Sequence, residues 1–328
     1  MTPTSRPTLL LTGSSGVIGA SLLTALTGRY EVISLVHRHR PHQAAVCVQA
    51  DLTADGLGLD AVRYRELAAT IDVIVHCAAL TAFAPPDLRA FDDINAEGTR
   101  RVLDLAEAAK APVVLLSSAA AAFDVPGDDL TAHSMRAYSL SKRRAEQLAA
   151  VCAQPVAVVR PALLFAALDA PGPPRHQFPH TLLTALLAGR TNGLPLHRDH
   201  WCDILPMETL TAYLTALTGA LLTGDTGAPG LHWTTAGAAR VSAADMEEAC
   251  LQILNDAGRQ PPKPLLADPA TFPPRTHGMA RMAQLGFQPP AQPALPSDLH
   301  RLLPTQPTRS DVLRALSQGA RRCAPWAQ

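Results

Sequence analysis

Tyr138 and Lys142, in the stretch AYSLSKRRAEQ, have the residue types and the spacing of an acid–base pair. Residues four apart share one face of a helix, so the Lys142 ammonium can lie near the Tyr138 hydroxyl. A free phenol has a pKa of about 10, and a fixed cation beside it lowers that pKa towards the range useful for proton transfer. Only three of the 28 basic residues are lysines, and the chain has four tyrosines, so a chance pairing is uncommon. We therefore interpret the pair as part of an active site.

One reaction that uses such an acid–base pair is carbonyl reduction, in which hydride adds to carbon while a proton reaches oxygen. That reaction needs a second hydroxyl to hold the carbonyl oxygen. The run VVLLSSAAAAF offers Ser117 and Ser118 at the carboxyl end of a predicted strand. Open α/β sheets bind their ligands at that edge. Either serine is a candidate partner for Tyr138.

A glycine-rich stretch near the start of the chain, TGSSGVIG, could hold the hydride donor. Gly13, Gly16 and Gly19 follow a short apolar run and open a helical pattern. Glycines there allow a tight turn and close approach of the backbone to a pyrophosphate, and a helix N-terminus supplies unpaired N–H groups. The spacing is GxxGxxG rather than GxGxxG, so a βα turn without a ligand is the alternative interpretation.

The residues after the second apolar run indicate which nicotinamide cofactor is bound. Arg38 and Arg40 follow that run, and the next carboxylate is Asp51. An acidic residue at this place accepts the ribose hydroxyls of NAD, whereas a guanidinium suits the 2′-phosphate of NADP. We therefore expect NADP(H); a solvated basic loop is the alternative.

The elements that must position these residues alternate along the first half of the chain. Strands are predicted at 8–12, 31–36, 45–49, 72–78, 112–118 and 155–161, and helices at 16–27, 60–69, 87–109 and 134–152. Continuous apolar runs indicate strands that are buried on both faces. The pattern predicts an α/β fold with a doubly wound parallel sheet.

The second half has a different character. It contains a Pro/Gly-rich loop at 169–179, one short strand at 230–235 and helical patterns near 180–189, 207–222 and 242–257. A dozen of the 29 prolines lie in 259–307, which disfavours long helices there. We predict a cofactor-binding domain with the catalytic residues over 1–165 and a smaller, mainly helical substrate region over 166–328, with interleaving of the two left open.

Composition excludes several classes of function. A formal net charge of zero gives no footprint for nucleic acid or an anionic membrane. No apolar run approaches the ~20 residues that span a bilayer, and the first residues do not resemble a signal peptide. Six cysteines without a CxxC pair are typical of reduced cytosolic thiols, and the histidines form no HExxH motif. We expect a cytoplasmic protein without metal, membrane or nucleic-acid partners.

Seven ordered motifs resemble those of the extended short-chain dehydrogenase/reductase family: TGSSGVIG, ADL (50–52), HCAA (76–79), NAEGT (95–99), LLSSA, YSLSK and RP (160–161). The resemblance covers about residues 8–220 and implies a Rossmann fold. It implies cofactor contacts at Gly13, Ser15, Gly16, Val17, Ile18 and Gly19 (pyrophosphate), Asp51 and Leu52 (adenine), Cys77, Ala78 and Ala79 (beyond the fourth strand) and Pro161 (nicotinamide).

The same resemblance implies catalytic roles. Ser118 would orient the carbonyl, Tyr138 would be the acid/base, and Lys142 would also bind the nicotinamide ribose. Asn95 would stabilise the helix that carries the site. By resemblance we also expect a homodimer.

Departures from the family pattern narrow the reaction. Dehydratases carry an acidic pair after the catalytic hydroxyl, where this chain has Ala119 and Ala120. A methyl group cannot abstract a proton, so dehydration is not expected. The Asn and Tyr-Gly pair typical of sugar epimerases is absent from RPALLFAALDAPG.

The stretch 182–217 resembles the thioester-reductase-like, or male-sterility, branch, whose members reduce acyl groups held on coenzyme A or a carrier protein. We therefore expect an NADPH-dependent reductase that converts a small or carrier-tethered acyl thioester to an aldehyde or alcohol. The alternatives are a ketone or aldehyde reductase, a hydroxysteroid-type dehydrogenase, a nucleotide-sugar epimerase, and a non-catalytic NADP-binding regulator.

Overall fold

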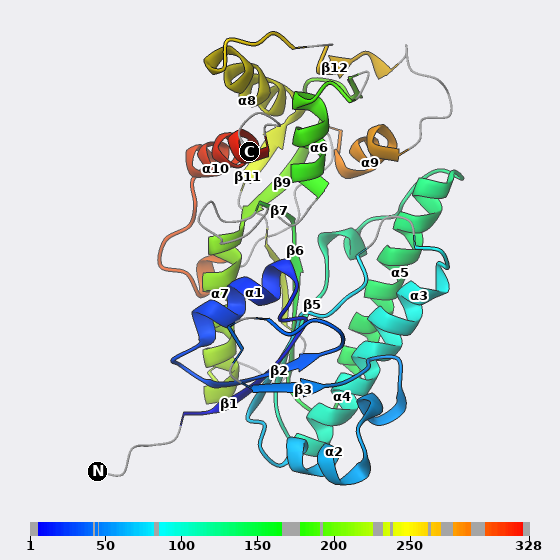
Figure 1. Cartoon of the computed structure of the whole chain (residues 1–328), viewed down its shortest axis with the longest axis vertical. Helices are drawn as coiled ribbons and strands as arrows, with labels where there is room; N and C mark the ends of the chain where they lie inside the picture. The colour runs from blue at the N-terminus through cyan, green and yellow to red at the C-terminus, as the bar shows by residue number, and fades with distance from the viewer. Residues whose placement is uncertain are drawn as a thin grey trace.

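The computed structural model describes residues 6–41, 43–44, 46–81, 85–165, 178–190, 193–225, 232–236, 239–261, 264–269, 278–289 and 299–323. Figure 1 shows the large sheet with α1, α2, α4, α5 and α7 in one part of the molecule, and α6, α8, α9 and α10 gathered beyond the end of that sheet. The predicted loop at 169–179 lies mostly outside the described residues.

A seven-stranded sheet with strand order β10-β6-β5-β4-β1-β2-β3 forms the centre of the larger part. All of its neighbouring strands pair in parallel. The strands are β1 (Thr8–Thr12), β2 (Glu31–Val36), β3 (Val46–Gln49), β4 (Val73–His76), β5 (Val113–Leu116), β6 (Val156–Pro161) and β10 (His232–Ala236). The predicted doubly wound parallel sheet is confirmed.

Helices cover both faces of this sheet because successive strand residues point to opposite sides. Leu9 and Leu11 pack in one fully buried cluster with side chains of α1 (Val17–Leu26) and α7 (Met207–Thr223). Leu10, between them, packs in a second cluster on the other face. That face is covered by α2 (Ala61–Ala68), α4 (Gly98–Ala109) and α5 (Leu130–Ala150). The sheet is thus packed between two apolar layers, one on each face.

The segment predicted as one helix at 87–109 is divided in the structure. It consists of a short α3 (Arg89–Phe91), a wide π-helical turn η2 (Asp92–Glu97) and α4. Such turns insert one residue into the helical repeat and are frequent at functional sites. Here the turn contains the buried side chain of Asn95.

The second part of the molecule contains more strands than the single one expected. A three-stranded sheet runs β11 (Ala239–Ser242)-β9 (Trp201–Pro206)-β7 (Leu163–Phe165), and β12 (Leu266–Ala267) pairs with β8 (Leu194–Pro195). The expectation was wrong because most of these strands have only two to four residues, too few to leave a periodic pattern. Around them lie α6 (Phe178–Leu187), α8 (Ala243–Asp256), α9 (Gly278–Gly286) and α10 (Arg309–Cys323).

Elements from beyond residue 165 return to the first sheet. β10 pairs with β6, and α7 packs against α1. Within 259–307 the described residues form only β12, the nine-residue α9 and a short turn, η5 (Leu299–Arg301). The proline-rich stretch therefore holds no long helix where it is described.

Candidate active site

The turn between β1 and α1 leaves no space for side chains at two of its glycines. Gly13 has φ of +70°, and a Cβ there would lie 2.6 Å from the backbone nitrogen of Ala78. A Cβ on Gly19 would overlap the carbonyl oxygen of Gly13. The turn is closed by the Gly16 N–H, which donates to the Gly13 carbonyl at 2.8 Å. Both positions thus require glycine for steric reasons.

This turn fits a dinucleotide pyrophosphate. Gly16 is the N-cap of α1, and no side chain caps the helix there. The first-turn N–H groups can then bind an anion. The predicted pyrophosphate residues Gly13, Ser15, Gly16, Val17, Ile18 and Gly19 lie together in this turn and at the start of α1. Ser14, which the sequence analysis did not select, is buried there, and its hydroxyl has no hydrogen-bond partner among the described residues.

The predicted adenine end lies at the ends of β2 and β3. The Asp51 carboxylate accepts hydrogen bonds from the backbone N–H and the hydroxyl of Thr53, at 2.8 and 2.7 Å. These bonds hold the pKa of Asp51 below its ordinary value. Leu52 follows, and Arg38 and Arg40 are exposed beyond β2. Both guanidinium groups are therefore accessible to a ligand that binds at this end.

Ser118 and Tyr138 are brought together by β5 and α5. Ser118 lies just beyond the carboxyl end of β5, Tyr138 is in α5, and the Ser118 hydroxyl lies close enough to the Tyr138 phenol to lower its pKa. The ring of Phe91 packs edge-on against Tyr138, with the ring centroids 5.8 Å apart. The two hydroxyls thus form one site at the carboxyl edge of the sheet, beside an apolar wall.

The pKa of Tyr138 differs from the expectation. Burial raises it above its ordinary value, and the interaction with the nearby Ser118 hydroxyl opposes that rise. The predicted lowering by Lys142 is wrong for this structure, in which the Lys142 Nζ instead donates to the Leu116 carbonyl at 2.9 Å. Desolvation of the phenolate outweighs any charge effect from the lysine.

Lys142 lies in the interior, with 5% of its surface exposed. Burial lowers its pKa to about 8, while Cys77 and the Glu146 carboxylate act in the opposite direction. Burial raises the pKa of the neighbouring Cys77 thiol to about 12. Ala78 donates its N–H to the Thr12 hydroxyl at 3.1 Å, which places the Cys77–Ala79 segment beside the glycine turn.

Asn95 links η2 to α5, the helix that carries Tyr138. Its Nδ2 donates to the Ser141 hydroxyl at 3.0 Å and to the Leu80 carbonyl at 3.1 Å, and its Oδ1 accepts from the Leu80 N–H at 2.7 Å. Ser141 in turn donates to the Tyr138 carbonyl at 2.7 Å. These bonds stabilise the helix that carries Tyr138.

A buried histidine that the sequence analysis did not select lies under the site. The His76 ring bonds Thr12 at 2.6 Å and Thr99 at 3.1 Å. The Thr99 hydroxyl donates to the Asn95 carbonyl at 2.6 Å, so it accepts from the His76 Nε2–H. Nδ1 then accepts from Thr12, which fixes a neutral tautomer. Burial and Lys142 lower the pKa of His76 to about 3.

A second unselected group lies behind Lys142. Glu146 is 3% exposed and accepts a hydrogen bond from the Ser117 hydroxyl at 2.5 Å. Arg160 contacts the same carboxylate with two nitrogens, each at 2.7 Å. Pro161, the predicted nicotinamide contact, ends β6 directly after Arg160. One signal was available: Glu146 continues the four-residue spacing of Tyr138 and Lys142.

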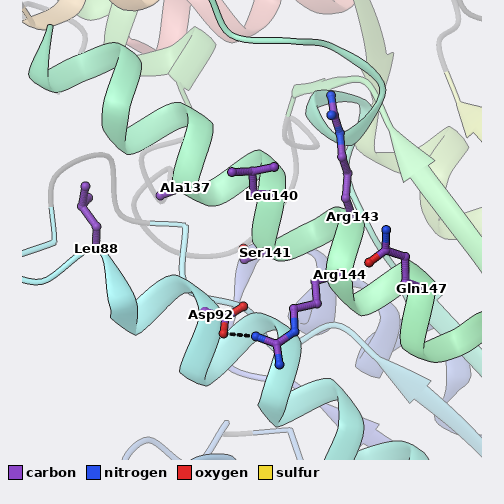
Figure 2. Close-up of a pocket in the computed structure, with 8 residues that line it drawn as sticks. All are labelled: Leu88, Asp92, Ala137, Leu140, Ser141, Arg143, Arg144 and Gln147. Atoms are coloured by element: carbon purple, nitrogen blue, oxygen red, sulfur yellow. Dashed lines mark hydrogen bonds and ion pairs between the residues drawn. The ribbon is translucent and has the colours of Figure 1, made fainter. Parts of the chain in front are cut away.

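A pocket of about 530 Å³ lies between α5 and the segment Leu88–Asp92 (Figure 2). It is lined by Leu88, Asp92, Ala137, Leu140, Ser141, Arg143, Arg144 and Gln147. Figure 2 shows the ion pair between Asp92 and Arg144 at this pocket. Most of its α5 residues project away from the face that carries Tyr138 and Lys142, since 100° separates successive helical residues. The pocket is therefore separate from the Ser118–Tyr138 site.

None of the described helices has the length and apolar character needed to cross a membrane.

Comparison with known proteins adds a family match and several relatives. The family described as "Male sterility protein" matches residues 40–213, just over half of the chain. Equisetin synthetase eqxS of Fusarium heterosporum is 34% identical over 108 residues, which are 30% of this chain and 3% of that protein. Two hybrid PKS-NRPS synthetases also match this chain. The matched region spans only 2–3% of the length of equisetin synthetase and of these two proteins.

A ceramide reductase of Caulobacter vibrioides (strain NA1000 / CB15N) is 27% identical over 241 residues, which are 71% of this chain and 69% of that protein. Among solved structures, MoeE5 in complex with UDP-glucose and NAD superposes with a TM-score of 0.67 at 20% identity, covering 96% of this chain and 98% of the other. The terminal R domain of the myxalamid PKS-NRPS pathway gives 0.59 at 21% identity, over 76% and 71% of the two chains. These structures show the shared fold.

Proposed function

Because the chain belongs to the male sterility protein family, we propose that it is an oxidoreductase that uses NADP(H) to reduce the carbonyl of an acyl thioester to an aldehyde. The observation that carries this proposal is the pair of neighbouring hydroxyls of Ser118 and Tyr138, close to buried Lys142 and the glycine turn. A redox cofactor, a proton donor and a hydroxyl for the carbonyl are the parts that such a reduction needs.

The residues divide the work of the reaction. The bound cofactor supplies the hydride. The hydroxyls of Ser118 and Tyr138 donate to the carbonyl oxygen of the substrate and stabilise the negative charge that develops there. Tyr138 then gives its proton to that oxygen, and a hemithioacetal results. Loss of the thiol from this hemithioacetal yields the aldehyde. Lys142, with a pKa of about 8, is mostly protonated at neutral pH and adds a positive charge near the oxygen on which negative charge develops.

The preference for NADP(H) rests on Arg38 and Arg40. Both are exposed directly after β2, and no carboxylate precedes Asp51 there. A guanidinium can bind the 2′-phosphate of NADP(H) through paired hydrogen bonds. NAD has no 2′-phosphate, so these two charges would have no partner on it. The Asp51 carboxylate is already engaged by Thr53.

The thioester as substrate is supported by two comparisons. The family match contains Ser118, Tyr138, Lys142 and the region up to residue 213. Equisetin synthetase and an adenylate-forming reductase, Nps9 of Serpula lacrymans var. lacrymans (strain S7.9), align with part of the chain. Carrier-tethered acyl chains are therefore the first substrates to test.

A second candidate is the reduction of a ketone, or the reverse oxidation of an alcohol. It is favoured by the alignment with the ceramide reductase, which covers 71% of this chain. The same hydroxyl pair serves this reaction, because only the group attached to the carbonyl differs. In that case no thiol leaves, and the product is an alcohol.

A substrate panel separates the two candidates. NADPH oxidation is followed by absorbance with acyl-coenzyme A esters, acyl groups on a carrier protein, ketones and aldehydes. The proposal predicts turnover of a thioester with release of one free thiol per hydride transferred. Turnover of ketones alone, with no thiol released from any thioester, would favour the second candidate and reject the first.

A further inference from the structure

Glu146 lies where three elements of the site meet. The residue is in α5, two helical turns after Tyr138 and one turn after Lys142. Its carboxylate accepts from Ser117, which directly follows β5, and from Arg160 in β6. Each of these two partners directly precedes a residue with a proposed role, Ser118 or Pro161. One buried carboxylate thus touches both strand ends that form the site.

The Lys142 side chain makes a parallel contact one helical turn away. Its Nζ donates to the carbonyl of Leu116, the last residue of β5. The end of β5 is therefore held to α5 at two adjacent residues, Leu116 by Lys142 and Ser117 by Glu146. These two bonds fix the backbone directly before Ser118, the next residue.

We propose that Glu146 is a positioning residue of the reductase, which fastens the ends of β5 and β6 to α5 beside the Leu116 carbonyl that binds the Lys142 ammonium. A buried carboxylate is costly unless it is paired, and here a two-nitrogen contact with Arg160 and the Ser117 hydroxyl satisfy it. The inference rests on the proposed function, since positioning matters only if Ser118, Tyr138 and Lys142 react.

The charges around Lys142 give this inference a measurable consequence. The groups that face it include Cys77 and His76 at the end of β4, Tyr138 and Glu146 on its own helix, and Arg160 beyond Glu146. Burial lowers the Lys142 pKa, and the Glu146 carboxylate raises it. Removal of that negative charge should therefore lower the Lys142 pKa further, from about 8.

The test compares Glu146→Gln with Glu107→Gln, which makes the same chemical change at an exposed carboxylate of α4. The chain has only three lysines, so selective ¹³C labelling at Cε gives three side-chain signals, assigned with Lys110→Arg and Lys263→Arg. We expect the Lys142 signal of Glu146→Gln to titrate about one pH unit lower, which is a tenfold smaller ammonium fraction at high pH. The alkaline limb of kcat/KM should move by the same amount, and Glu107→Gln should leave both unchanged.

An unchanged Lys142 titration in folded Glu146→Gln would overturn the inference. If this variant does not fold, Glu146→Asp keeps the charge at a greater distance and should shift the titration in the same direction by less; no shift would again overturn it. Because the titration is measured without substrate, it is independent of the proposed reaction. Inactivity of the wild type on every carbonyl tested would reject the proposed function, and the titration would still decide how Glu146 acts on Lys142.

Discussion

Asn95 donates a 3.0 Å hydrogen bond to the Ser141 hydroxyl, and this bond joins the π-helical turn η2 to the helix that carries Tyr138. The contact spans 46 residues of sequence and is buried. The Ser141 hydroxyl in turn donates a hydrogen bond to the Tyr138 backbone carbonyl at 2.7 Å. The orientation of the proposed acid–base residue thus depends on a side chain from another helix.

Asn95→Ala should destabilise the protein and slow the reaction together. The change leaves the Leu80 backbone groups without their side-chain partner, and each buried polar group left unpaired costs roughly 1–3 kcal/mol. Urea unfolding measures the loss. The exposed Asn255→Ala is the control, and its free energy of unfolding should change by no more than about 0.5 kcal/mol. Equal stability of the two variants would contradict the role given to Asn95.

Gly13→Ala should weaken cofactor binding strongly. The new methyl group would meet the Ala78 backbone and so displace the turn that fits the pyrophosphate. Gly28→Ala is a matched control, because Gly28 also has positive φ, at +92°, but no atom lies within 4 Å of its added Cβ. Fluorescence titration with NADPH should show at least about tenfold weaker binding for Gly13→Ala, equivalent to about 1.4 kcal/mol, and normal binding for Gly28→Ala. Normal binding by Gly13→Ala would argue against this turn as the cofactor site.

Arg38→Ala should weaken NADPH binding and leave NADH binding nearly unchanged. The guanidinium is expected to contact only the 2′-phosphate, a group that NADH lacks. Titration of wild type and variant with both cofactors measures the preference, and a loss of about 1.5–3 kcal/mol is typical of a hydrogen bond to a charged group. Tighter binding of NADH than of NADPH by the wild type would reject the NADP(H) assignment.

The buried His76 should make stability depend on pH. Its pKa of about 3 in the folded chain lies below the value of about 6.5 of an unfolded histidine. As the pH falls below about 6.5, the unfolded chain gains a proton that the folded chain does not, so stability falls towards pH 3. Urea unfolding between these values should show a smaller decline for His76→Asn than for the wild type. The same decline in both would contradict the buried neutral histidine.

The rate should fall as pH rises through the Lys142 pKa. The ammonium is charged below about pH 8 and neutral above it, so kcat/KM is expected to decline on the alkaline side. Lys142→Arg retains a charge at all accessible pH values and should remove this limb, even if its rate is lower. A limb at the same pH in this variant would assign it to another group.

The first half of the fold could be predicted because each strand there is a continuous apolar run followed by a helical pattern. The glycine turn and the residues Ser118, Tyr138 and Lys142 could be selected for a related reason, since each is local in sequence or lies at a predictable sheet edge. Their roles in binding and catalysis remain predictions. The division into two domains and the expected homodimer remain predictions.

Other features depended on packing between distant segments. Glu146 and Arg160 meet only because α5 lies against the ends of β5 and β6. His76 is neutral because burial and Lys142 lower its pKa, and Thr12 and Thr99, from β1 and α4, bond its two ring nitrogens. The raised pKa of Tyr138 comes from burial, which no spacing of residues reports. Strands as short as β8 and β12 carry no periodic signal.

The most direct test of the account is NADPH oxidation by Tyr138→Phe with an acyl thioester as substrate. The variant keeps the ring and its contact with Phe91 and loses only the hydroxyl that lies near Ser118. We predict a rate at least about 100-fold below that of the wild type, with NADPH bound as tightly, because general acid–base groups contribute factors of that size. Full activity of Tyr138→Phe would contradict the proposed mechanism.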